Sequence, residues 1–507
     1  MRFSDGQPVG RQSAMGGEVR ARRMGKHVRG IPEGGAVWGG GSRYAPDPKF
    51  GFKGPWASGR GGWSRGRGVW VLLLLVAGPL CLGAFLAVRM PGAAGVGGPA
   101  EPSGGWADAV PESMALAGRR DVGHRVSALG FELVRHAWQE NGRKGNVVVS
   151  GPSVATALGL AATGTTGGGE AGGELMRVLR LPLAHAEGRA AYGDALGWGT
   201  QSTADPGATL VQATGAWVSG DVRAWYVGEV RRAFGADVGE LVGGREGAEL
   251  INAWVESKTV GLIQGLVDEV DPRAAAALVS AVYFKGSWAR RFDAAETRDG
   301  TWTGLDGGKR PARMMHRRIR AAEELPEDAT SAVRWAALPG VGDMVELPYG
   351  TGSRFRCLMV LPAAAGGEAL DHVVRVLTPE KVVAWSGLLG VRELELRLPR
   401  FKVEWGVADL TDALRDLGVS EAFDGRGAFL GMIDDPDVVI GSVLHKAAME
   451  VNEEGTEAAA ATAVMMMRTA IVDAVTVSLD RPFVMLVQDM RSEAVLFTAV
   501  VADPTLT

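Results

Sequence analysis

Apolar positions recur at helical and at strand spacing from about residue 120 onward. Val126, Leu129, Leu133 and Ala137 share one face of a helix, which predicts an amphipathic helix over 122–140. Short apolar runs bounded by turn-forming residues predict strands. These runs are 147–149, 278–284, 357–361, 394–398, 474–479, 483–488 and 495–501. Because helical and strand segments mix without regular alternation, the pattern favours an α+β fold over a doubly wound sheet.

A second helix is predicted directly after the strand at 147–149. Ser153 belongs to the residue types that cap helix N-termini, and we expect it to cap this helix. The helix is expected to run to about Gly164, because the glycines at 167–169 then interrupt the apolar pattern.

A longer apolar run, residues 69–88, contains no charged residue. Its twenty residues, as a helix, would rise about 30 Å, the thickness of the hydrocarbon core of a bilayer. Arginines precede the run at 60, 65 and 67, which by the positive-inside rule places the N-terminus in the cytosol. We expect a transmembrane signal anchor, with the following domain lumenal or extracellular. A cleaved signal peptide, which would give a secreted protein, and a buried soluble helix are the alternatives.

Charge divides unevenly along the 507 residues. Residues 1–68 carry net +9 and are rich in Gly and Arg, whereas 69–507 carry net −13. Such composition predicts a disordered, cytosolic tail over 1–68 and a flexible linker over 89–120, which leads to a domain at 121–505. The arginines and the aromatic ring within 60–68 are also typical of RNA-binding segments, but a basic flank of a membrane helix explains them more simply. No nucleic-acid partner is therefore expected.

The chemistry-bearing residues give little support for an enzyme. Two cysteines, Cys81 and Cys357, exclude a disulfide framework or a multi-cysteine zinc site. There is no HExxH and no Walker A sequence, and the seven histidines are scattered. We therefore expect neither catalysis nor a cofactor nor a bound metal.

The most informative segment is 450–470, EVNEEGTEAAAATAVMMMRTA. Its alanines and preceding acidic residues favour a helix over 457–464. The same residues also suit an extended strand, because Thr456, Ala458 and Ala460 would then point to one side with small side chains. Gly455 supplies a pivot that is free of the Cβ restriction on φ. From the residues alone both conformations are open.

This segment resembles the hinge and reactive-centre loop of an inhibitory serpin. Further blocks that resemble the family occur in order: NVVVSGPSVATAL at 146–158, INAWVESKTVGLI at 251–263, LVSAVYFKGSW at 278–288, LPRFKVE at 398–404 and HKAAMEVNEEGTEA at 445–458. The resemblance covers roughly residues 120–505.

The resemblance implies a fold of three β-sheets and about eight or nine helices, with an exposed reactive-centre loop. In inhibitory serpins a protease cuts this loop and forms an acyl-enzyme, and the loop then inserts as a strand into the main sheet and traps the protease. The residues that match the hinge are Glu453, Glu454, Gly455, Thr456, Glu457, Ala458, Ala459, Ala460, Ala461 and Thr462. None of them is proline, and the tract is small, so the resemblance implies an inhibitor, expected to be a monomer, whose partner is a serine protease.

Two positions compete as the scissile residue. The usual spacing from the hinge glycine indicates Thr469, whereas Arg468 fits the carboxylate-bearing pocket of a trypsin-like protease. We expect the bond Arg468–Thr469 and a trypsin-like target. Cleavage after Thr469 would indicate an elastase-like protease instead.

Some residues depart from the family pattern. The sheet-opening region is matched by Ser150, Ser153, Ser280 and His445, but the proline in Ser150-Gly151-Pro152-Ser153 is displaced by one residue. Ser280 replaces the asparagine whose amide would pair with His445. Thr498-Ala499 stands where the C-terminal block of the family usually carries Gly-Arg or Gly-Lys. A non-inhibitory serpin that acts as a chaperone or carrier is the alternative function.

Overall fold

The computed structural model describes residues 118–165, 169–197, 207–320, 331–456 and 474–506. The chain divides into two units, Met1–Gly92 and Ala93–Thr507, and all described residues belong to the second. The predicted tail, the apolar run and nearly all of the predicted linker lie outside the described residues and stay predictions.

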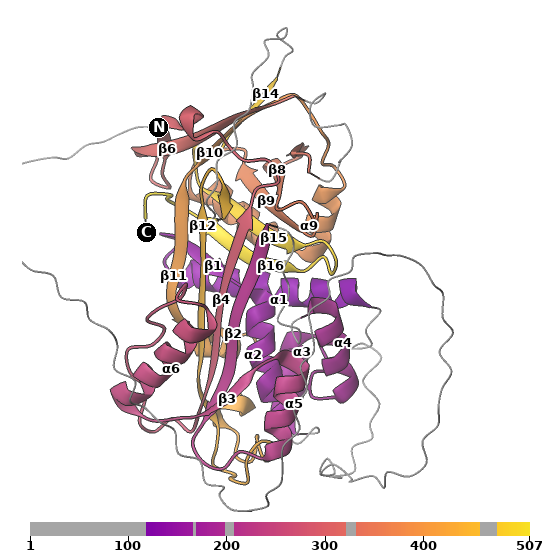
Figure 1. Ribbon diagram of the computed structural model, residues 1–507, viewed down its shortest axis with the longest axis vertical. Coiled ribbons are helices and arrows are strands. Elements are labelled where there is room, and N and C mark those ends of the chain that lie inside the picture. The colour runs from indigo at the N-terminus through magenta and orange to yellow at the C-terminus, as the bar shows by residue number, and fades with distance from the viewer. Residues whose placement is uncertain (1–117, 166–168, 198–206, 321–330, 457–473, 507) are drawn as a thin grey trace, which may run out of the picture. The chain divides into compact units, whose positions relative to one another are not determined.

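One of the two six-stranded sheets, called the main sheet below, has the strand order β11-β12-β4-β2-β3 (Figure 1). A short strand, β13, also pairs with β4. The strands of this sheet are β2 (Ala208–Val218), β3 (Asp237–Glu240), β4 (Ala276–Ser287), β11 (Phe401–Asp409), β12 (Ile440–Val451) and β13 (Gly455–Thr456). β4 and β12 are parallel and paired from Ala276 to Tyr283, so the centre of this sheet is closed.

β4 reads as a nearly continuous apolar run because both of its faces are buried. Leu278, Val282 and Phe284 belong to the main core. Val279 and Ala281, which point to the other face, belong to a second cluster with residues of helix α6 (Gly244–Lys258).

The other two sheets complete the α+β architecture. One has the order β1-β16-β15-β9-β8-β7 and is antiparallel throughout. Its strands are β1 (Val147–Val149), β7 (Arg334–Leu338), β8 (Gly342–Pro348), β9 (Phe355–Pro362), β15 (Phe483–Asp489) and β16 (Val495–Val501). The third has the order β14-β10-β6-β5, with β5 (Arg298–Thr303), β6 (Lys309–Ile319), β10 (Leu394–Pro399) and β14 (Val475–Ser478). β14, β10 and β6 are labelled at the top of Figure 1.

Ten α-helices lie within the described residues, and two of them have six residues or fewer, in agreement with the expected eight or nine. Besides α6 they are α1 (Arg119–Glu140), α2 (Gly151–Gly164), α3 (Glu170–Leu179), α4 (Ala186–Leu196), α5 (Ala224–Phe234), α8 (Gly367–Val376), α9 (Pro379–Ser386), α10 (Thr411–Asp416) and α11 (Glu421–Asp424). The predicted α+β fold with three sheets is thus confirmed.

The expected cap of α2 was wrong by three residues. Ser150, not Ser153, is the N-cap, because the Ser150 hydroxyl accepts a hydrogen bond from the Ser153 backbone N–H (3.3 Å). Pro152 then falls in the first turn, where proline is tolerated because that backbone N–H needs no intrahelical partner. The helix therefore starts at Gly151, and all fourteen of its residues are buried.

Within the described residues, no helix combines the length and the apolar character that crossing a membrane requires. The run 69–88 lies outside them, so the signal anchor stays a prediction.

A strained residue directly follows the C-cap of α6, the helix that covers one face of the main sheet. The last turn forms a Schellman motif, in which the Gly261 N–H donates to the Glu256 carbonyl (2.8 Å). The motif needs a left-handed residue at position 260, and Val260 adopts it with φ 53° while 81% of its surface is exposed. A β-branched side chain is disfavoured in this conformation, and glycine or asparagine usually occupies the position.

Replacing Val260 should stabilise the fold. Val260→Asn is expected to raise the free energy of unfolding by about 1 kcal/mol, because asparagine tolerates the left-handed conformation and almost no burial is lost. Urea unfolding followed by circular dichroism measures the change. Val383→Asn, at another exposed valine, is the control and should not stabilise the protein. A Val260→Asn protein no more stable than wild type would contradict the assignment of strain.

Candidate functional site

The end of β12 turns back toward β4 within five residues. The Asn452 N–H donates to the Gly455 carbonyl (2.8 Å), and the Gly455 N–H donates to the Asn452 carbonyl (3.2 Å). Gly455 and Thr456 then pair antiparallel with Ser287 and Gly286 of β4. The first residues of the predicted hinge therefore already hold strand positions beside β4.

An ion pair between buried Glu453 and half-exposed Arg400 fixes this turn. The carboxylate of Glu453 accepts hydrogen bonds from Nε of Arg400 (2.7 and 2.6 Å to its two oxygens) and another from the hydroxyl of Thr297. Burial by itself would raise the pKa of Glu453, but the hydrogen bonds from Arg400 and Thr297 outweigh it and hold the pKa below its usual value. Glu453 is thus ionised and anchored at neutral pH.

Trp288 holds the same turn from the end of β4. Its backbone N–H donates to the Glu454 carbonyl (2.8 Å), and its indole N–H donates to the Asn452 carbonyl (2.9 Å). The ring is stacked on Tyr349 with the centroids 4.6 Å apart. Trp288 is therefore a core residue that also orients the turn.

Gly455 cannot be replaced by a residue with a side chain without disturbing the turn. Its φ is 145°, and a Cβ atom at this position would lie 2.0 Å from the carbonyl oxygen of Gly286. Any side chain would therefore push this segment away from β4.

The rest of the predicted loop lies outside the described residues. This concerns the hinge residues Glu457, Ala458, Ala459, Ala460, Ala461 and Thr462 and the expected scissile pair Arg468 and Thr469. Of Thr456 the structure describes the backbone pairing. The roles of all these residues stay predictions.

The four residues of the predicted sheet-opening region come together beneath the turn, at the closed centre of the sheet. Ser280 of β4 is the register partner of His445 of β12. The Ser150 backbone N–H donates to Nε2 of His445 (3.2 Å), so the imidazole is neutral there and its proton is on Nδ1, 3.4 Å from the Ser280 hydroxyl. That hydroxyl lies 2.5 Å from the hydroxyl of Ser153. The chain of hydrogen bonds joins β4, β12 and α2.

Sequence reasoning missed the partners that anchor the hinge. Arg400, Thr297 and Tyr349 come from three separate segments, and no spacing rule connects any of them with Glu453 or Trp288. The available signal was the arginine in LPRFKVE, a block that the resemblance had matched without giving Arg400 a role.

The buried histidine makes stability depend on pH. Burial lowers the pKa of His445 to about 4, and the hydrogen bond with the Ser280 backbone opposes this only in part. The unfolded chain binds a proton below pH ~6.5 and the native fold only near pH 4, so stability is lost as the pH falls through this window. Relative to His445→Gln, wild type is expected to lose about 3 kcal/mol of its free energy of unfolding as the pH falls from 6.5 to 4.

Urea unfolding at several pH values tests this expectation. His372→Gln, at an exposed histidine, is the control and should follow wild type at every pH. A constant difference between wild type and His445→Gln would show that His445 titrates normally in the fold.

Adding a methyl group at position 455 should release the turn. Gly455→Ala is expected to break the pairing with β4, and hydrogen exchange of the Trp288 amide should accelerate at least about ten-fold because its acceptor is the Glu454 carbonyl. Exchange followed by NMR or mass spectrometry measures this. Gly173→Ala, where a Cβ atom meets nothing within 4 Å, is the control. Unchanged protection of Trp288 would mean that the turn tolerates a side chain.

Comparison with known proteins places this geometry in a family. The family model described as "Serpin (serine protease inhibitor)" matches residues 124–504. Serpin-ZXA of Oryza sativa subsp. japonica is 31% identical over 422 residues, which cover 78% of this chain and 100% of that protein. Serpin B6 of Pongo abelii is 34% identical over 259 residues, which cover 50% of this chain and 65% of the relative.

A solved structure supports the fold. Human thyroxine-binding globulin superposes with a TM-score of 0.67 over 76% of this chain and 100% of that one, at 20% identity. Because the family model matches well over half of the chain, and Serpin-ZXA is matched over its whole length, the protein belongs to the serpin family.

Proposed function

We propose that this protein inhibits a serine protease by offering the loop after Thr456 for cleavage and then inserting it as a strand between β4 and β12. The observation that carries the proposal is the pairing of Gly455 and Thr456 with Ser287 and Gly286. The inserted strand would run antiparallel to β4, as Gly455 and Thr456 already do. Insertion therefore extends an existing ladder and does not have to start a new one.

The lengths of the loop and the sheet agree. From Gly455 to Arg468 there are thirteen steps, about 43 Å of extended strand. β4 has twelve residues, about 40 Å. A loop cut after Arg468 therefore provides enough chain to run along the whole of β4.

The energetics favour insertion once the loop is cut. The inserted strand would gain ladder hydrogen bonds on both sides, each worth about 1 kcal/mol net, so a dozen of them would match the stability of a whole domain. Against this stand the direct β4–β12 pairing and the hydrogen bonds around His445, which must open first. Stored strain that is released by loop insertion is a known type of protein switch.

The proposed target is a trypsin-like protease that cuts Arg468–Thr469, because a guanidinium pairs strongly with a carboxylate at the base of the protease pocket. Cleavage after Thr469 by an elastase-like protease is the alternative. We also propose that residues 69–88 anchor the protein in the membrane, with the serpin domain lumenal or extracellular.

Trapping can be tested by preventing insertion without blocking cleavage. With trypsin, the full-length protein should give a covalent complex that survives SDS, and the released C-terminal fragment should begin at Thr469. The double variant Thr456→Arg, Ala458→Pro should be cut at a similar rate but lose at least about 90% of the complex, since a bulky charge and a missing N–H both oppose strand insertion.

Glu457→Gln, which adds no arginine for trypsin to cut at, is the matched control. Position 457 is expected to point away from the small-residue side of the inserted strand, so this variant should still form the complex. A double variant that traps trypsin as well as wild type would overturn the insertion mechanism. Wild type that is cut without any complex would favour the carrier or chaperone alternative.

A further inference from the structure

A groove of about 330 Å³ lies between helices α4 and α5. Small residues form its floor: Ala190 and Gly193 of α4, Gly197 at the C-cap of that helix, and Ala233 of α5. A Cβ atom at Gly193 would lie 3.2 Å from the Ala233 carbonyl oxygen, so the two helices approach closely here. The floor is therefore apolar, and the groove has the size of a small binding site, with room for one large apolar side chain.

Arginines stand on one side of this groove. Arg189 and Arg232 both line it, and both pair with the same carboxylate, that of Glu229 (2.7 and 2.8 Å). Arg189 is buried, whereas 62% of the Arg232 side chain is exposed. Two guanidinium groups thus share one negative charge, and the exposed one can meet a further carboxylate.

A second excess of positive charge surrounds Asp194, the acidic residue of the lining. The hydrogen bond and the charge of Arg119 hold the pKa of Asp194 below its usual value, and the charge of Arg491 adds to the effect. Arg491 is exposed and forms no ion pair with another residue in the described part of the chain. Here too, one carboxylate stands between two guanidinium groups.

The N-terminal part of the chain enters the described structure beside the groove. α1 starts at Arg119, whose Nε and Nη2 atoms donate to the two carboxylate oxygens of Asp194 (both 2.9 Å). Gly118, directly before it, has φ 127°, a conformation that residues with a side chain rarely adopt. The chain therefore turns at Gly118, within the length of one arginine side chain from the groove.

The sequence that precedes Gly118 complements the groove in charge and in character. Residues 91–117 contain three carboxylates, at 101, 108 and 112, and no Lys, Arg or His. The largest apolar side chain among them is Trp106. Twelve steps separate Trp106 from Gly118, at most about 43 Å of chain, so the indole can reach any part of the groove.

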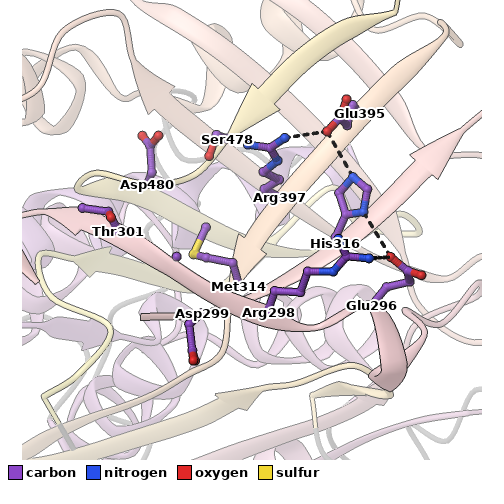
Figure 2. A pocket seen from close by; sticks show the side chains of 11 residues that line it. Glu296, Arg298, Asp299, Thr301, Met314, His316, Glu395, Arg397, Ser478 and Asp480 are labelled. Carbon is purple, nitrogen blue, oxygen red and sulfur yellow. Dashed lines mark hydrogen bonds and ion pairs between the residues drawn. The ribbon is translucent and has the colours of Figure 1, made fainter. Parts of the chain in front are cut away.

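The pocket on the third sheet is a poorer match for this sequence (Figure 2). Arg397 pairs there with Glu395 and Arg298 with Glu296, both at 2.7 Å. Both arginines of the pocket are thus paired with carboxylates of its own lining, as the dashed lines in Figure 2 show. An acidic segment would find no excess of positive charge among these pairs.

We propose that residues 106–117 dock in the groove between α4 and α5, with Trp106 seated on the floor of alanine and glycine residues. Asp108 and Glu112 would then lie beside the arginines of the rim. Tryptophan suits such a contact because its ring offers a large apolar area, while the indole N–H can remain at the wet edge. The linker predicted at 89–120 would be confined to 89–105. The proposal does not depend on protease inhibition.

Hydrogen exchange of the full-length protein, followed by mass spectrometry, tests the docking. Peptides that cover 106–117 should exchange at least about ten-fold more slowly than a synthetic peptide of the same sequence. Exchange at the rate of the synthetic peptide would overturn the proposal.

Two variants test whether the groove is the docking site. Trp106→Ala removes the anchor, and Ala190→Phe fills the floor from an exposed position of α4. Each should reduce the protection of 106–117 to about two-fold or less, and the two together should do no more, because they remove the same contact. Protection that survives both changes would rule out this groove.

Ala253→Phe, at an exposed alanine of α6, is the matched control and should keep the protection of 106–117. The amides of α5 are measured in the same samples, and their unchanged protection shows that the variants are folded. Protection of 106–117 that disappears on dilution would assign the groove to the segment of a second copy, and would overturn docking within one chain.

Discussion

The direct pairing of β4 with β12 is the constraint on which the other features of this protein depend. Parallel strands are paired somewhat less stably than antiparallel ones, and here two of them close the middle of the main sheet. Hydrogen bonds secure the closure at two levels, through His445 at the centre and through Glu453 and Trp288 at the turn.

Seven of the sixteen strands in the described part of the chain were predicted from the sequence, as short apolar runs, whereas the largely buried β12 was not. The runs at 147–149 and 495–501 coincide with β1 and β16, and the other predicted strands differ from the structure by a few residues at their ends. β4 extends beyond its predicted bounds at both ends, because Ala276 and Ser287 take part in ladders whose partners lie elsewhere in the chain. Periodicity detects burial, and it does not detect ladder partners.

The site was less predictable, because its contacts are long-range. The resemblance identified His445 and Ser280, and the structure brings them into register. It gave no role to Arg400, whose guanidinium meets Glu453 across 53 positions of sequence. The cap of α2 was misplaced for another reason: Ser150 and Ser153 are the same residue type, and only the hydrogen bond from the Ser153 N–H to the Ser150 hydroxyl identifies Ser150 as the cap.

The small hydroxyl at Ser280 has a kinetic consequence. Under the proposed mechanism the open arrangement would hold more hydrogen bonds than the closed one, so the closed sheet persists because its opening is slow. The useful lifetime of such a protein is a half-life that is set by an activation barrier. Ser280, in direct contact with both His445 and Ser153, belongs to the contacts that must break on opening. Changes at this position would therefore alter how long the active form lasts more than how tightly it is folded.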